Sequence, residues 1–353
     1  MRSVKTLAQD GKYVIFESPD GPKRLLNLCS NDYLGVAADE DLREKFLTDF
    51  TRSKAAISLP SARLLSGNSS VYDELEKLLA REVGHEKALL FNSGYHANVG
   101  IYSSLAGFGD VVFCDRLNHA SIIDGIKLGG AKLIPYGHLD YEDLKAKLKK
   151  YRAQYKKAII ATESLFSMDG DFCDLDALLA LKKEFDCFLI VDEAHSFGIS
   201  ATCAGADLTM ATFGKAIGSY GAFCAGDEAV IHHLVNHARP FIFSTVFPQI
   251  SAAFTKFVLE EGNLPARAAK LQEIITALGE KSHIIPRILG EDAVAVKASE
   301  ALMQEGFYAL PIRYPTVKKG SARIRLSLTS LITLQEVEKA LKVLTNLETA
   351  CKL

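Results

Sequence analysis

The sequence contains no apolar run long enough to span a bilayer, and its first residues lack the apolar core of a signal sequence. It also lacks an excess of either charge, because 41 lysines and arginines stand against 43 aspartates and glutamates, with a formal net charge of -2. We therefore expect neither a membrane protein nor a general binder of nucleic acid or anionic membranes.

The seven cysteines are scattered, and no pair has the C-x-x-C spacing of a zinc knuckle. An odd number of cysteines, several of them in apolar runs, is typical of reduced thiols, so we expect a cytoplasmic protein without a disulfide framework. The 353 residues, 48% hydrophobic and 24% charged, suit a globular protein with one large and one small domain.

From about residue 70 onward, short apolar runs alternate with helical patterns such as residues 141–151 and 175–185. The apolar runs are residues 88–91, 111–114, 133–136, 158–161, 188–191, 208–211 and 221–225. Continuous apolar strands with helices between them predict an α/β fold, with a mostly parallel seven-stranded sheet that is covered on both faces.

After about residue 245 the pattern changes to that of a smaller α+β domain. The predicted elements there are a helix over residues 250–261, a strand over 293–296, a helix over 299–304, strands near 308–312 and 322–328, and a last helix over 334–347. We therefore expect an N-terminal segment over residues 1–45, a large cofactor-binding domain over 46–245 and a small C-terminal domain over 246–353.

Polar and ionisable residues follow many of the predicted strands. These segments are residues 92–95, 115–119, 163–167, 192–195 and 212–215. Ligands of parallel α/β sheets bind beyond the carboxyl ends of the strands, so these segments converge on one edge and predict a site there.

Lys215 is the strongest single indication of chemistry, because it lies between glycines after an apolar run. Asp192 ends an earlier apolar run, and the two side chains come within reach if those runs are neighbouring strands. This pair suits pyridoxal phosphate (PLP), held by the lysine as a Schiff base with the carboxylate on the ring nitrogen. A positively charged ring nitrogen would also stabilise the ionised form of a buried Asp192. The alternative for Asp192 is a helix N-cap or an ordinary acid at the end of a strand.

Two histidines lie in these segments. His195 can hydrogen-bond a phenolic oxygen, and His119 lies at a predicted helix start, where its ring can stack on a heterocycle. Alone, either residue is more typical of a structural histidine. Residues 192–195 also match the box of one helicase group, but the required phosphate loop G-x-x-x-x-G-K-[ST] is missing. A metal site at Asp192 and His195 lacks a third ligand with a telling spacing.

Hydroxyl groups and a helix start complete the predicted edge. Ser93 and Gly94 open a helix whose N–H groups can bind a phosphate, Thr212 adds a hydroxyl near Lys215, and Ser167 can hold a polar ring substituent or cap a turn.

Arg323 and Arg325 lie two apart on a predicted strand and therefore share a face. A guanidinium suits a substrate carboxylate, and the alternative is a solvated basic face.

Together these segments resemble the α-oxoamine synthases, PLP enzymes of the fold-type-I aminotransferase class. The resemblance extends from residues 31–35 to 323–326, which is most of the chain. The most specific matches are residues 66–69, 117–121, 166–170, 192–195 and 212–215.

The resemblance implies that Lys215 binds the cofactor covalently and moves the substrate α-proton, that Asp192 pairs with the ring nitrogen, and that His119 stacks on the ring. The further cofactor contacts that it implies are Ser93, Gly94, Tyr95, Ser167, His195, Thr212, Ser244 and Thr245.

Substrate contacts and a homodimer are implied in the same way. Ser244 and Thr245 match a segment that reaches the phosphate across a dimer interface, so that the active sites are shared. Arg325 matches the arginine that binds the amino-acid carboxylate, Thr316 matches a substrate-contacting threonine, and Asn31 lies in the segment at the substrate entrance. The family joins an amino acid to an acyl thioester with loss of carbon dioxide, and no metal is implied.

Two branches of the family are represented. Residues 61–69 and 313–316 are most similar to 8-amino-7-oxononanoate synthases, which use L-alanine and a pimeloyl thioester of CoA or acyl carrier protein in biotin biosynthesis. Residues 118–125 are closer to glycine C-acetyltransferases, which use glycine and acetyl-CoA. We favour the first branch. The rival classes are a nucleotide-driven motor, disfavoured by the missing phosphate loop, and a non-catalytic scaffold, disfavoured by the intact Lys215, Asp192 and His119.

Overall fold

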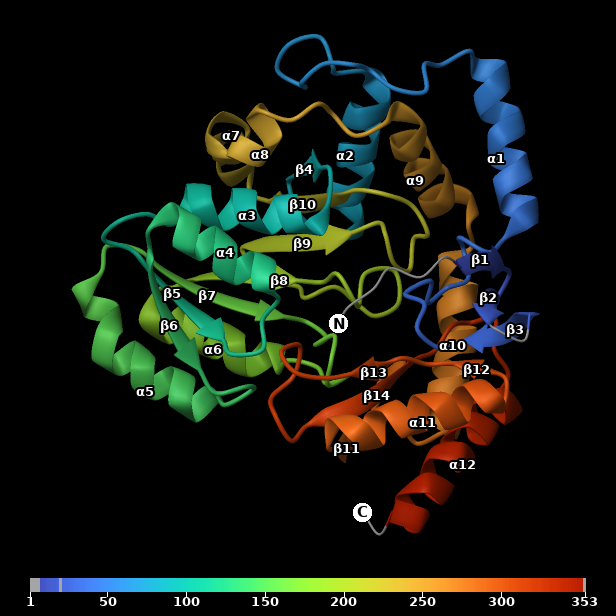
Figure 1. Ribbon diagram of the computed structural model, residues 1–353. Helices are drawn as coiled ribbons and strands as arrows, with labels where there is room; N and C mark the ends of the chain where they lie inside the picture. Colours follow the sequence, from blue (N-terminus) through green and yellow to red (C-terminus); the bar gives the residue numbers. More distant parts are fainter. Residues whose placement is uncertain (1–6, 19–20, 352–353) are drawn as a thin grey trace. The chain divides into compact units, whose positions relative to one another are not determined.

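The computed structural model describes residues 7–18 and 21–351 of the chain, which fold as two compact units (Figure 1). What we call the terminal unit comprises the described residues of Met1–Leu42, Ser167–Asp171 and Asn263–Leu353. The central unit comprises Arg43–Phe166 and Phe172–Gly262. The three-part division at residues 45 and 245 stays a prediction.

The central unit is built on a seven-stranded sheet. Its strands in spatial order are β4 (Lys87–Phe91), β10 (Ala222–Gly226), β9 (Leu208–Thr212), β8 (Phe188–Asp192), β7 (Ala158–Glu163), β5 (Val111–Asp115) and β6 (Lys132–Tyr136). Only β10 runs antiparallel to its neighbours. The predicted sheet is therefore confirmed, and each predicted run matches its strand within one or two residues.

Successive residues of these strands point into two different cores. The helices that cover the sheet are α3 (Gly94–Leu105), α4 (Ala120–Gly129), α5 (Tyr141–Tyr151) and α6 (Leu175–Phe185). On β5, Val112 and Cys114 pack with α3 and α4, whereas Val111 and Phe113 pack with α5 and α6 on the opposite face (Figure 1). Burial on both faces explains why the strands are apolar throughout rather than alternating.

The central part of the chain contains further helices. They are α1 (Glu40–Ser53), α2 (Ser70–Glu82), a short 3-10 turn (Arg152–Gln154), α7 (Glu228–His237), α8 (Arg239–Ile242) and α9 (Gln249–Glu261). Ser69 is the N-cap residue of α2. The Tyr72 hydroxyl of α2 donates to the carbonyl oxygen of Phe247 at 2.9 Å, which ties α2 to the stretch before α9.

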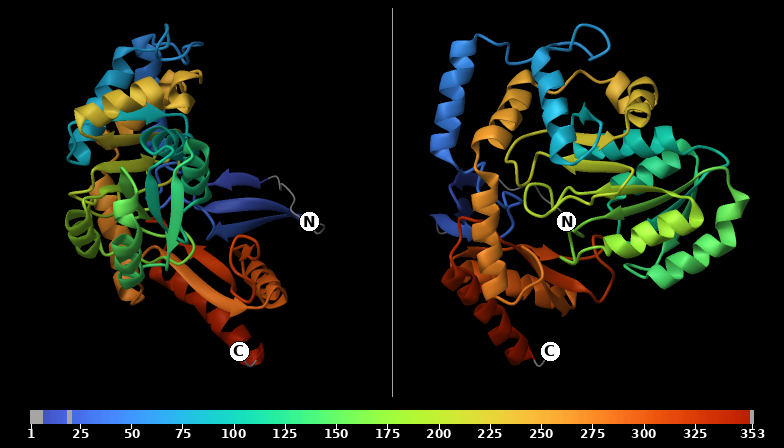
Figure 2. Two further views of the ribbon diagram at one scale, coloured as in Figure 1. Left: turned by 90° about the vertical axis from the view of Figure 1, so that its left-hand side faces the viewer. Right: turned by 180° about the vertical axis from the view of Figure 1, so that it is seen from behind.

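The terminal unit contains two small sheets and three helices. One sheet joins β1 (Leu7–Asp10), β2 (Tyr13–Ser18), β3 (Gly21–Asn27) and β12 (Phe307–Tyr308), and the other joins β11 (Ile284–Gly290), β14 (Ala322–Ser327) and β13 (Pro311–Ile312). The helices are α10 (Leu264–Ala277), α11 (Asp292–Gln304) and α12 (Leu334–Cys351). Figure 2 shows the paired strands β1 to β3 in blue. The predicted smaller α+β domain is confirmed.

The strand predicted at residues 293–296 is wrong, because these residues belong to α11. Alternating alanine and valine favoured a strand, but Ala295, Ala298 and Leu302 are buried at helical spacing. The strand of this region is β11, which begins nine residues earlier and pairs antiparallel with β14. No helix in the described part of the chain combines the length and apolar character that crossing a membrane requires.

Gly125 marks a close approach of α3 and α4, and we expect Gly125→Ala to destabilise the fold. A Cβ there would lie 2.7 Å from the carbonyl oxygen of Asn98 and 3.0 Å from the Cα of Val99. Shifting that backbone costs about 1–3 kcal/mol, which outweighs the gain of about 1 kcal/mol in helix propensity. Calorimetry should show a lower melting temperature than for the control Gly107→Ala, where the nearest atom lies at 3.8 Å. Equal melting temperatures would contradict the packing described.

Candidate active site

Lys215 lies in a tight turn after β9. Its carbonyl oxygen accepts a hydrogen bond from the Gly218 N–H at 2.9 Å, and Gly218 has a φ of +62°, a conformation that glycine adopts without strain. The backbone N–H of Phe213 donates to Gly221 at 2.9 Å and closes the loop. The half-buried lysine is therefore held at the carboxyl edge of the sheet, as its glycine neighbours predict.

Asp192 ends β8, the parallel neighbour of β9, so the two apolar runs do lie side by side. The residue is 5% exposed. Its Oδ2 accepts a hydrogen bond from Nδ2 of Asn98 at 2.8 Å, and its Oδ1 accepts one from the Ala194 N–H at 2.9 Å. Both oxygens of this buried carboxyl group therefore have a hydrogen-bond donor, which fixes the orientation of the group. His195, in the turn that follows, is also buried.

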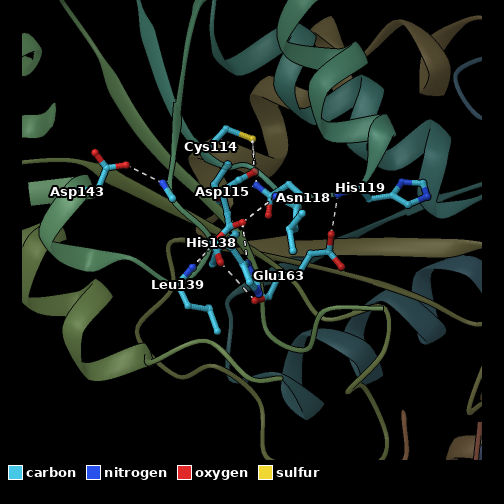
Figure 3. Close-up of polar contacts among 12 residues, drawn as sticks. Cys114, Asp115, Asn118, His119, His138, Leu139, Asp143 and Glu163 are labelled. Atoms are coloured by element: carbon cyan, nitrogen blue, oxygen red, sulfur yellow. Dashed lines mark hydrogen bonds and ion pairs between the residues drawn. The ribbon is translucent and has the colours of Figure 1, made fainter. Parts of the chain in front are cut away.

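His119 is the N-cap residue of α4 and is anchored to β7 by its backbone. Its N–H donates to Oε1 of Glu163 at 2.6 Å (Figure 3). The preceding Asn118 donates from Nδ2 to the carbonyl oxygen of Ala161 at 2.8 Å and to Sγ of Cys114 at 3.1 Å. The loop before α4 is thus tied to two strands, and the imidazole of His119 has a fixed base.

Asp115, at the end of β5, forms hydrogen bonds with two neighbouring loops. Its buried carboxylate accepts hydrogen bonds from the backbone N–H of Leu117 at 2.8 Å and of Leu139 at 2.9 Å, and lies 3.0 Å from Nδ1 of His138 (Figure 3). His138 in turn packs edge-on against Phe166, with ring centroids 4.5 Å apart. One carboxylate therefore holds the loops that follow β5 and β6.

Glu163 is a buried residue of this edge that residue-by-residue prediction missed. It lies on β7 opposite Asp192 in the strand register. Burial raises the pKa of the Glu163 carboxyl well above its usual range; the charge of Asp192 raises it further, and the Lys215 ammonium acts in the opposite direction. The predicted segment of residues 163–167 pointed to this position without assigning it a role.

The start of α3 forms the other end of the edge. Ser93 is its N-cap residue and accepts a hydrogen bond from the His96 N–H. A Cβ on Gly94 would lie 3.7 Å from the Cβ of Thr212, so these two residues are neighbours. Nδ2 of Asn92 donates to the carbonyl oxygen of Thr245 at 2.9 Å, which brings residues 244–245 beside this helix start.

Tyr95, in the first turn of α3, is 48% exposed. Its hydroxyl donates to Oδ2 of Asp124 in α4 at 2.6 Å. This bond raises the pKa of the Tyr95 hydroxyl.

The remaining predicted residues belong to the terminal unit. The guanidinium of Arg325 donates from Nε to the carbonyl oxygen of Ser167 at 2.5 Å, from Nη2 to the hydroxyl of Tyr33 at 3.1 Å, and from Nη1 to Ser327 at 2.8 Å and Asn31 at 3.5 Å. These partners are all neutral. The structure therefore brings Asn31, Ser167 and Arg325 together.

Arg323, the neighbour of Arg325 on β14, instead pairs with Asp169 at 2.7 Å. Both arginines are buried, so the alternative of a solvated basic face is wrong. Thr316 lies in an exposed turn, where its N–H donates to Arg313 at 2.9 Å.

Comparison with known proteins gives the family. The sequence profile of the family Aminotransferase class I and II matches residues 23–344. The chain belongs to this family.

Relatives agree along almost the whole chain. A protein of Haemophilus influenzae (strain 86-028NP), provisionally named 8-amino-7-oxononanoate synthase, is 40% identical over 362 residues, which cover 96% of this chain and 94% of the relative. A protein of Pasteurella multocida (strain Pm70) with the same provisional name is 40% identical over 371 residues, with 98% and 95% covered.

Solved structures with the same fold include serine palmitoyltransferase of Sphingomonas wittichii, with a TM-score of 0.87, 26% identity, and coverage of 98% of this chain and 92% of that chain. They also include 8-amino-7-oxononanoate synthase from Francisella tularensis, with a TM-score of 0.77, 27% identity, and coverage of 93% and 99%.

The predicted membership of the α-oxoamine synthases, the fold type and the PLP cofactor are confirmed, and the motor and scaffold alternatives are rejected. This member of the family is a PLP-dependent acyltransferase. The central unit fits the cofactor, because a half-buried lysine, a buried carboxylate with oriented oxygens and the start of a helix lie at one edge of one sheet.

We expect Glu163→Gln to change how stability depends on pH. The raised pKa means that the folded protein binds more protons than the unfolded chain from the ordinary glutamate value of 4.5 upward, so this carboxyl lowers stability as pH rises. Glutamine keeps the acceptor for the His119 N–H but does not ionise. The urea midpoint of the variant relative to wild type should therefore be higher at about pH 8 than at about pH 5.

The matched control is Glu184→Gln, which alters an exposed glutamate paired with Lys145 on the surface. It should show little change between the two pH values. Parallel pH profiles for wild type and Glu163→Gln would show that the carboxyl at residue 163 does not have the raised pKa described.

Proposed function

We propose that the protein condenses L-alanine with a pimeloyl thioester and releases carbon dioxide and the thiol, giving 8-amino-7-oxononanoate for biotin biosynthesis. The observation that carries this proposal is the 40% identity, over 96% of the chain, to relatives provisionally named for that activity. The carrier of the pimeloyl group is CoA or acyl carrier protein.

The central edge of the sheet would hold the cofactor. When bound, PLP supplies an electron-poor ring that accepts the electrons left on the substrate carbon. Lys215 would bind it covalently and later move the substrate α-proton at Nζ. Asp192, whose oxygens are oriented by Asn98 and Ala194, would pair with the ring nitrogen, and His119 would stack on the ring.

The remaining edge residues would orient the cofactor. The backbone N–H groups of Ser93 and Gly94 lie at the N-terminal end of α3. This end of a helix favours negative charge and therefore suits the phosphate. The further proposed contacts are Tyr95, Ser167, His195, Thr212, Ser244 and Thr245. Supporting this set, Gly94 neighbours Thr212 in the same chain. Ser244 and Thr245 are proposed to reach the phosphate bound by the other subunit.

Arg325 would bind the amino-acid carboxylate. A buried guanidinium whose hydrogen bonds go to neutral oxygens has an uncompensated charge that an anion can satisfy, in contrast to Arg323 with its Asp169. Asn31, within hydrogen-bond reach of Arg325, and Thr316 are proposed as further substrate contacts.

The second candidate function is glycine C-acetyltransferase, which residues 118–125 resemble. The decisive assay mixes the purified protein with L-alanine and pimeloyl-CoA in one reaction, and with glycine and acetyl-CoA in another, and measures released CoA and the amino-ketone product. We expect faster turnover with alanine and pimeloyl-CoA. Turnover with the glycine pair alone would favour the second candidate, and turnover with neither pair would refute both.

We also propose a cytoplasmic homodimer with shared active sites, on the family resemblance of residues 244–245. Sedimentation velocity of the active protein should give twice the chain mass, and an active monomer would refute the shared site.

Lys215→Ala should remove the covalent cofactor link. We expect wild type to be yellow when loaded with PLP, and the variant to lose the visible band and at least roughly 100-fold in turnover, because it lacks the proposed proton-transferring group. Absorption spectroscopy after dialysis measures the link. Lys183→Ala, an exposed lysine of α6, should keep both properties; if Lys215→Ala also keeps them, the assignment of Lys215 is wrong.

Arg325→Ala should raise the KM for the amino acid roughly 10- to 100-fold, the loss expected for charge-assisted hydrogen bonds. The KM for the acyl thioester should change far less. The control is Arg287→Ala, which removes an arginine of β11 that pairs with Glu280. It should leave the KM values for the amino acid and for the acyl thioester near those of wild type. An unchanged amino-acid KM in Arg325→Ala would exclude its role in carboxylate binding.

A further inference from the structure

Two buried polar side chains lie between Asp192 and His119, and sequence motifs did not identify either of them. Asn98 of α3 is 1% exposed, and Ser121 of α4 is fully buried. Burying polar groups costs free energy unless they satisfy one another, so their partners show what they orient.

The amide of Asn98 donates in two directions. One hydrogen of Nδ2 goes to Oδ2 of Asp192 at 2.8 Å, and the other goes to Oγ of Ser121 at 3.0 Å. The reversed amide would place its carbonyl oxygen against a carboxylate, which offers no donor. We therefore assign the amide orientation from Asp192, and that orientation makes the Ser121 hydroxyl an acceptor towards Asn98.

The hydroxyl of Ser121 is left with its own hydrogen to donate. Its Oγ lies 2.7 Å from Nδ1 of His119, and the backbone N–H of Ser121 points at the same nitrogen, 3.3 Å away. A backbone N–H can only donate, so Nδ1 must be the acceptor. The ring proton of His119 then lies on Nε2.

We propose that Asn98 and Ser121 are positioning residues, a hydrogen-bond relay that transmits the orientation of the Asp192 carboxylate to the imidazole of His119 and holds it as the Nε2–H tautomer. This inference rests on the proposed roles of Asp192 and His119 at the cofactor. The relay ties the carboxylate that would pair with the ring nitrogen to the imidazole that would stack on the ring, so that both side chains keep one orientation.

The backbone of His119 is fixed independently by Glu163, so the relay governs the ring rather than the position of the loop. Rotation of the imidazole by half a turn would put a carbon atom where Ser121 donates two hydrogen bonds. That loss keeps the ring in a single orientation, with the Nε2–H directed away from the Oγ of Ser121.

The test uses Ser121→Ala, which removes the relay oxygen alone, with Asn98→Ala as the second variant. Ser104→Ala is the matched control, because its hydroxyl donates to carbonyl oxygens of its own helix, α3. Histidine labelled with ¹⁵N is incorporated, and the His119 ring nitrogens are identified by their absence in His119→Gln. Spectra are recorded with and without PLP, and the dissociation constant for PLP is measured by absorbance.

In wild type and Ser104→Ala we expect an unprotonated Nδ1 and a protonated Nε2. In Ser121→Ala the shorter of the two bonds to Nδ1 is lost and only the backbone N–H, 3.3 Å away, still donates to it. A measurable fraction of the ring should then carry its proton on Nδ1, and PLP should bind roughly 5- to 50-fold more weakly, as expected for a lost buried hydrogen bond. A wild-type spectrum with the proton on Nδ1, or an unchanged tautomer in Ser121→Ala, would overturn the relay. If Asn98→Ala does not fold, Ser121→Ala decides. Failure of wild type to bind PLP would refute the proposed cofactor roles, while the PLP-free spectra still decide the relay.

Discussion

Buried carboxylates at one edge of the central sheet constrain the arrangement of everything around them. Asp115, Asp192 and Glu163 end neighbouring parallel strands or strands one apart, and each is almost inaccessible to water. A carboxyl oxygen in such a place is tolerable only with hydrogen-bond donors directed at it. The loops that follow the strands supply those donors from their backbones, so the buried carboxyl groups also fix the conformation of these loops.

In the terminal unit the buried charges are positive. There a cation is buried, and Arg325 is held by carbonyl, hydroxyl and amide oxygens that orient it without neutralising it. Arg323, on the same strand, has its carboxylate in Asp169 and is structurally complete. Two identical side chains thus differ in the charge of their partners, although both are buried.

The architecture of the central unit could be predicted because burial on both faces leaves an unbroken apolar signature in each strand. The neighbouring placement of Lys215 and Asp192 followed from that same pattern. Residues 293–296 misled because alternating alanine and valine satisfy a strand locally, while packing of α11 decided otherwise. Asn98 and Ser121 could not be predicted from the sequence for a related reason. Their hydrogen bond depends on the packing of α3 against α4, at the contact that Gly125 permits.

The thiol of Cys114 lies under the loop of His119, where it accepts a hydrogen bond from Asn118, and burial raises its pKa to about 12. Burial also raises the pKa of Cys29 in the terminal unit, despite the nearby charge of Arg325. Thiolates, not thiols, exchange acyl groups with thioesters. With raised pKa values, Cys114 and Cys29 stay protonated and are poor nucleophiles. An acyltransferase gains from this, because an acyl group is then not transferred to these two cysteines.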